Sequence, residues 1–121
     1  MPPYIHSIAW ASEGVATLIV RNDTHSCVVF AHPFDGSVDD RIREPLIGFN
    51  AQGIVAVEGT VPQLLQVGGG FVHEVIGCVV DRLRPLIRVG SILIEPDIPL
   101  PGDVAEGILV WFRVQRLDHM G

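Results

Sequence analysis

The segment Gly107–Leu117, which reads GILVWFRVQRL, places the strongest constraint on how this chain can fold. It is too short to cross a membrane as a helix, and its apolar residues alternate as they do in a strand. One face of that strand carries Ile108, Val110, Phe112 and Val114. The opposite face carries Leu109 and Trp111, at positions where a small domain normally shows polar groups to water. The fold must therefore provide cover for Leu109 and Trp111 as well.

The segment Phe71–Leu83 raises the same difficulty. Its apolar residues divide between two strand faces, with Val75 and Val79 on one and Ile76, Cys78 and Val80 on the other. Helices can cover both faces of a sheet, but this sequence predicts only one short helix. Two such strands therefore favour self-association, for which a symmetric homodimer is the commonest form. The alternative is an enclosed sandwich, in which one chain covers both faces by itself.

Turn residues separate short β-rich runs at intervals of about 8–12 residues, which is typical of all-β domains. We expect a single domain over residues 1–121, built as a small closed or partly open antiparallel barrel with an OB-like Greek key. A two-layer sandwich is the alternative architecture. Thr60 can cap a short helix, Gln63 can complete the capping box, and Gly68 can end it after about two turns.

Two turns are predicted from local sequence. Asn50-Ala51-Gln52-Gly53 lies between Leu46–Phe49 and Ile54–Glu58, which predicts a hairpin. Around Gly90-Ser91 the apolar positions change phase, and a strand can change phase only through a bulge or a turn.

The charge of the chain limits its partners. It has 121 residues, a net charge of −6 and only 18% charged residues, and all eight basic residues are arginines. An acidic chain lacks the basic field that attracts nucleic acid or anionic membrane, and it suits a basic protein partner. The absence of lysine excludes Schiff-base chemistry and a phosphate-loop lysine. MPPYIHSIAW has no signal-peptide pattern, so we expect a cytoplasmic protein with free Cys27 and Cys78.

The leading hypothesis is a small β binding module that forms a homodimer and recognises a protein. An acidic adaptor or antagonist of a basic protein is one specific form of this hypothesis. The predicted interface residues are the apolar side chains left over by the core pattern, namely Leu109, Trp111, Phe71 and Val75.

A second hypothesis is an OB-type binder of single-stranded nucleic acid. Such proteins combine a basic groove with aromatic platforms, which Arg82, Arg84, Arg88, Arg113 and Trp111 would supply. Seven acidic residues in the same half of the chain weigh against it, because arginines on strand exteriors usually pair with such acids.

A third hypothesis is a small enzyme in which His32 acts as a base oriented by Asp35 or Asp39. The sequence contains no complete metal-binding motif, and we expect neither a metal nor a cofactor. The glycines of VGGGF precede a strand and lack a following lysine, so a flexible loop explains them better than a phosphate site.

Overall fold

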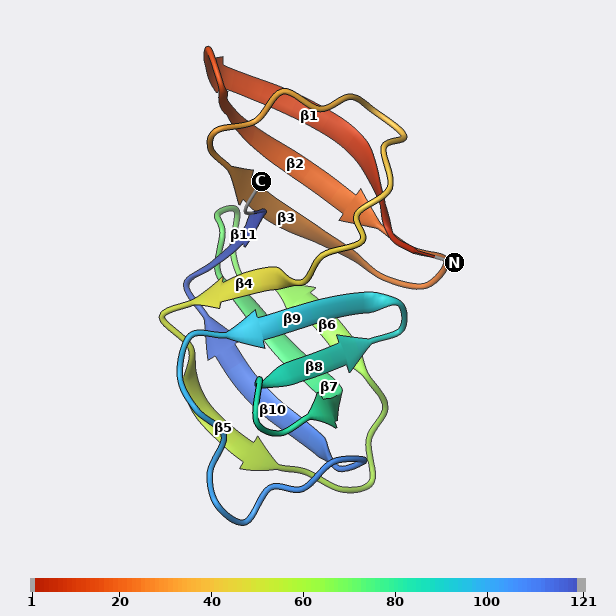
Figure 1. Cartoon of the computed structure of the whole chain (residues 1–121), viewed down its shortest axis with the longest axis vertical. Coiled ribbons are helices and arrows are strands. Elements are labelled where there is room, and N and C mark those ends of the chain that lie inside the picture. Colours follow the sequence, from red (N-terminus) through yellow and green to blue (C-terminus); the bar gives the residue numbers. More distant parts are fainter. Residues whose placement is uncertain (1, 120–121) are drawn as a thin grey trace.

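Alternating apolar residues form strands along most of the chain, because β-branched side chains fit a half-buried pleated surface. The computed structural model of the protein describes residues 2–119, and every regular element in that range is a strand (Figure 1). The strands are β1 (Tyr4–Ser12), β2 (Val15–Arg21), β3 (Ser26–Ala31), β4 (Leu46–Phe49), β5 (Gln52–Ala56), β6 (Gln63–Gln66), β7 (His73–Asp81), β8 (Leu86–Val89), β9 (Ile92–Pro96), β10 (Leu109–Val114) and β11 (Arg116–His119).

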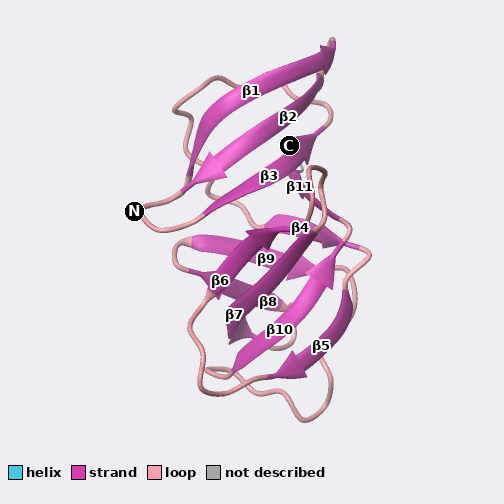
Figure 2. Cartoon of the chain, turned by 180° about the vertical axis from the view of Figure 1, so that it is seen from behind, coloured by secondary structure: helices cyan, strands magenta, loops and turns pink. Residues whose placement is uncertain are grey.

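The eleven described strands form one mixed sheet in the order β1-β2-β3-β11-β4-β9-β8-β7-β10-β5, with β6 paired to β7. Most neighbours are antiparallel, and the parallel pairs are β3 with β11 and β4 with β9. Strands β1 to β3 form one end of the molecule, and β5 to β10 lie around the other end (Figures 1 and 2). Strand β11 lies between β3 and β4 and so connects the two ends.

A single cluster of buried apolar side chains extends through both ends of the molecule. It includes Leu18 and Val29 from the first end and Val75, Ile94 and Phe112 from the second. Along β10 the burial alternates, with Val110, Phe112 and Val114 fully buried as predicted. The inward face of each strand therefore supplies the core, and the outward face remains available for other roles.

The sheet has two free ends, β1 and β5. The predicted barrel with its OB-like Greek key is therefore not confirmed, and the strands do not separate into the two sheets of a sandwich. The all-β class is confirmed for the described residues. Residues 2–119 contain no helix of the length and hydrophobicity needed to cross a membrane.

The short helix predicted between Thr60 and Gly68 is absent, and β6 occupies this part of the chain. All four residues of β6 pair antiparallel with His73–Ile76 of β7. A two-turn helix has a costly nucleus, whereas this strand gains a ladder of hydrogen bonds and buries Leu64. Tertiary pairing therefore overrides the local capping signal.

The predicted hairpin between β4 and β5 is also wrong. Strand β4 pairs with β9 and β11, whereas β5 pairs with β10. Asn50 and Gly53 both have positive φ angles, 55° and 70°, so the chain turns a corner instead of reversing. The carboxylate of Asp97 accepts hydrogen bonds from the backbone N–H groups of Asn50 (2.7 Å) and Ala51 (2.9 Å), which holds this corner in place.

The phase change at Gly90-Ser91 is confirmed as a turn. These residues join β8 to β9, which pair antiparallel, and Gly90 has a φ of 59°. Across this turn Ile87 and Ile94 lie directly opposite each other, and both are buried on the same face of the sheet.

Candidate interaction face

The outer surface of β5, β6, β7 and β10 carries apolar side chains from four neighbouring strands. The antiparallel register places Trp111 between Val55 of β5 and Ile76 of β7, and it places Leu109 beside Cys78. We call this surface the Trp111 face and define it by Val55, Leu65, Ile76, Cys78, Leu109 and Trp111. None of the six side chains is charged at neutral pH.

The Trp111 face is only partly shielded from water. Val55 and Leu65 are 50% and 51% exposed, and the other four residues are half-buried. A Cβ atom added at Gly53 would lie 3.0 Å from the Trp111 indole, so this glycine lets the ring approach the backbone of β5 closely. In Figure 2, β7 and β10 lie toward the viewer with no described element in front of them. Leu109 and Trp111 therefore remain half-buried in the single chain.

The other two predicted interface residues lie elsewhere. Val75 has an exposed fraction of 0% and belongs to the core, so its prediction as an interface residue is wrong. Strand alternation explains this, because Val75 is one residue out of phase with Ile76 of the Trp111 face. Phe71 precedes β7 and packs edge-to-face on Phe30 of β3, with ring centroids 6.1 Å apart.

The arginines of the nucleic-acid hypothesis divide into two groups. Arg82 donates from Nε to the carbonyl of Val104 at 2.9 Å and from Nη2 to that of Pro101 at 3.3 Å. Arg84 forms an ion pair with Glu95, with an N–O distance of 3.1 Å. Arg82 thus holds the segment before β10, whereas the ion pair of Arg84 with Glu95 is a surface contact.

Arg88 and Arg113 lie on the same side of the sheet as Trp111. Arg113 is directly opposite Glu74 on β7, and Arg88 is directly opposite Cys78. Trp111, Arg88 and Arg113 therefore share one side of the sheet, but Arg88 lies level with Leu109 and two strands away from β10, and Glu74 lies opposite Arg113.

The residues of the enzyme hypothesis lie in an exposed loop. The imidazole Nδ1 of His32 lies 3.2 Å from the carbonyl oxygen of Gly14, and neither Asp35 nor Asp39 hydrogen-bonds to it. None of the three lines any of the four concave regions found on the described chain. The arrangement lacks the carboxylate partner that would orient His32 as a base.

Pattern analysis did not single out His73, which is the one buried polar side chain among the described residues. Its Nε2 accepts a hydrogen bond from the backbone N–H of Val28 at 3.2 Å, and its Nδ1 donates to the carbonyl of Phe71 at 2.9 Å. These contacts require the neutral ring, and burial lowers the pKa of His73. His73 has the same strand parity as buried Val75 and Val79, which is the signal that could have identified it.

A second feature with no local sequence signal is the stacking of Arg116. Its guanidinium lies 4.5 Å from the ring centre of Phe30 and 5.1 Å from that of Phe49. The carboxylate of Asp118 accepts from its Nε at 2.6 Å and from its Nη2 at 3.0 Å, which raises the pKa of Arg116. The three strands β3, β11 and β4 are joined by this cluster on their outer surface.

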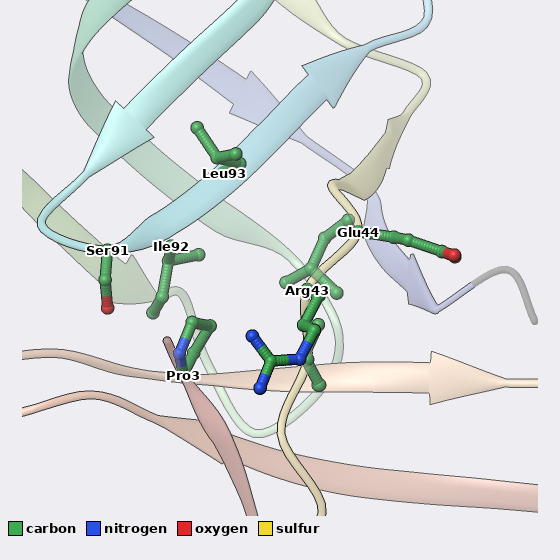
Figure 3. A pocket seen from close by; sticks show the side chains of 8 residues that line it. Pro3, Arg43, Glu44, Ser91, Ile92 and Leu93 are labelled. Atoms are coloured by element: carbon green, nitrogen blue, oxygen red, sulfur yellow. The ribbon is translucent and has the colours of Figure 1, made fainter. Parts of the chain in front are cut away.

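The concave regions on the described residues are three wide surface hollows of about 210 to 380 Å³ and one small pocket. The pocket in Figure 3 lies between Pro3, Arg43, Ser91 and Ile92, and its free volume of about 10 Å³ matches a single water molecule. Ser91 Oγ is buried there without a hydrogen-bond partner among the described residues, which a water molecule would supply. Glu44 points away from the pocket in this view.

The two cysteines are free, as predicted, and they differ in environment. Cys27 is buried in the core, and burial raises the pKa of its thiol to about 12. Cys78 is half-buried on the Trp111 face. Within residues 2–119 no group of three or more His, Cys, Asp or Glu residues is arranged to hold a metal ion.

Comparisons with models of protein families, with curated proteins and with solved structures gave no match to this chain. Its function must therefore be argued from its own surface.

Proposed function

We propose that this protein is a small binding module that recognises protein surfaces and associates with itself through the Trp111 face. The observation that supports this most is the apolar Trp111 face on the outer surface of β5, β6, β7 and β10, which has Glu74 and Arg113 at its border and no described element in front of it in Figure 2. Apolar patches of this kind on soluble proteins usually mark an interface. A central tryptophan surrounded by aliphatic residues is also the usual composition of a binding hot spot.

The charge distribution supports a protein partner over a small molecule. The chain has a net charge of −6, so two copies repel except where they meet through uncharged surface. The three larger hollows on the described residues, of about 210 to 380 Å³, are wide and open to solvent, whereas a small ligand is usually held in an enclosed cleft. A basic protein is the second class of partner that the acidic exterior suits.

Replacement of Trp111 tests this proposal. We expect Trp111→Glu to abolish self-association, because a carboxylate at the centre of the face would be desolvated in the complex. Trp10→Glu is the matched control, since Trp10 is 53% exposed but lies on β1 at the far end of the sheet. The measurement is the molar mass by light scattering over a concentration series, with circular dichroism to verify folding.

The native thiols provide an independent measurement without a substitution on the face. Cys78 should react with a thiol reagent in dilute solution, whereas buried Cys27 should not. We expect the reaction of Cys78 to slow as the protein concentration rises, because self-association buries the face. A wild-type chain that stays monomeric and labels at a constant rate would refute the proposal.

A further inference from the structure

Strand β5 ends the sheet beside the Trp111 face. It pairs only with β10, and four of its five residues are exposed. Both views place it toward the outside of the molecule, with the segment between β9 and β10 running past its lower end (Figures 1 and 2). A strand in this position presents a row of unpaired backbone groups that can pair with a further strand.

The register identifies the unpaired groups. The N–H of Val57 donates to the carbonyl of Leu109, and Val55 is opposite Trp111, so odd-numbered residues direct their backbone groups toward β10. Ile54 and Ala56 consequently direct theirs away from the sheet. None of the described residues forms a backbone hydrogen bond with them on that side. The segment that follows β9 forms its backbone hydrogen bond with β4 and not with β5, because the N–H of Asp97 donates to the carbonyl of Gly48.

The composition of this edge favours a second copy of the chain as its occupant. Natural edge strands are usually protected by charged residues or proline, but the run Ile54-Val55-Ala56-Val57 contains neither. Two chains of net charge −6 repel each other least where both surfaces are uncharged, and this run is uncharged in both copies. Pairing of a strand with itself in antiparallel orientation also closes a two-fold dimer.

We propose that two copies join β5 to β5 about a two-fold axis, with Val55 opposite the partner's Val55. In this register Ile54 exchanges backbone hydrogen bonds with the partner's Ala56, and Ala56 exchanges them with the partner's Ile54. The outer row Ile76–Trp111–Val55 of one copy then continues directly into the same row of the other. The inference rests on the proposed self-association and specifies its geometry.

The substitution Ala56→Pro tests this register. Proline removes the N–H that faces away from β10, and it is tolerated on edge strands. We expect the variant to be monomeric at concentrations where the wild type has twice the mass of one chain, with an unchanged circular dichroism spectrum. Ala56→Ser keeps the N–H and is the matched control, which should remain dimeric.

Hydrogen exchange measured by NMR on the wild-type chain tests the same contact without any substitution. The amides of Ile54 and Ala56 should exchange rapidly in dilute solution and at least tenfold more slowly in the dimer. The amide of Val57 should be protected in both conditions, because it already donates to Leu109.

The outcomes separate the two proposals. A dimeric wild type with a folded, dimeric Ala56→Pro variant and a monomeric Trp111→Glu variant would overturn the β5 pairing and leave the role of the Trp111 face intact. A wild type that remains monomeric at every concentration would overturn both. Concentration-independent exchange at Ile54 and Ala56 in a dimeric wild type would also overturn the pairing.

Discussion

His73 supplies a hydrogen-bond acceptor at a point in the sheet where β3 has no paired strand on one side. Strand β11 pairs with β3 only from Val29 onward, so the N–H of Val28 lacks a strand partner on that side. The imidazole Nε2 replaces this partner, and its Nδ1–H is satisfied by the carbonyl of Phe71. A protonated ring would have no acceptor for Val28 and would place a charge inside the core.

The stability of the fold should therefore depend on pH through His73. The unfolded chain binds a proton at the ordinary histidine pKa of 6.5, whereas the folded chain binds it only at lower pH. Stability is thus fully present above pH 6.5 and is lost as the pH falls through the range below it. Urea unfolding at a series of pH values measures this loss.

Two variants assign the pH effect to the correct ring. His73→Gln should be destabilised by about 1–3 kcal/mol at neutral pH, since it disturbs two buried hydrogen bonds, and it should lose the dependence below pH 6.5. His32→Gln, at an exposed position, should keep the wild-type profile. An unchanged profile in His73→Gln would contradict the assignment.

At the scale of the elements, β7 and the antiparallel strand β8 approach each other closely at Gly77. A Cβ atom at Gly77 would lie 2.5 Å from Ile87 Cγ2 and 2.8 Å from the carbonyl oxygen of Arg88. Strand β8 can therefore approach β7 closely only because residue 77 has no side chain.

We expect Gly77→Ala to lower the free energy of unfolding by about 1–3 kcal/mol, because β8 must shift to admit the methyl group. Gly69→Ala is the control, since no atom lies within 4 Å of a Cβ atom at that position. Thermal unfolding of both variants measures the difference. Equal midpoints for the two would contradict the packing described here.

The strand pattern could be predicted from sequence where alternation was strong, as in β7 and β10, and this also located Leu109 and Trp111 on an outer face. The pairing of strands could not be predicted, because it depends on partners far away in the chain. Strand β6 formed where capping residues indicated a helix, and β4 and β5 turned a corner where a hairpin was expected. The stacking of Arg116 between Phe30 and Phe49 likewise exists only after β3, β4 and β11 have paired.

At the scale of the whole molecule, charge bears on the nucleic-acid hypothesis. Arg82 and Arg84 are engaged within the chain, and the net charge is −6. We expect no binding of a fluorescent single-stranded oligonucleotide by anisotropy, even at low salt, where phosphate contacts are strongest. Salt-sensitive binding that disappeared in an Arg88→Gln/Arg113→Gln double variant would instead support the nucleic-acid hypothesis.

The central place of β11 has a consequence for biosynthesis. A ribosome makes this strand after every other strand described, yet its neighbours are β3 and β4, so neither can complete its ladder until β11 emerges. Premature termination or proteolytic trimming that removed the chain from Arg116 onward would open two seams in the middle of the sheet. Nascent chains of this protein must thus stay protected from aggregation until translation has passed that point.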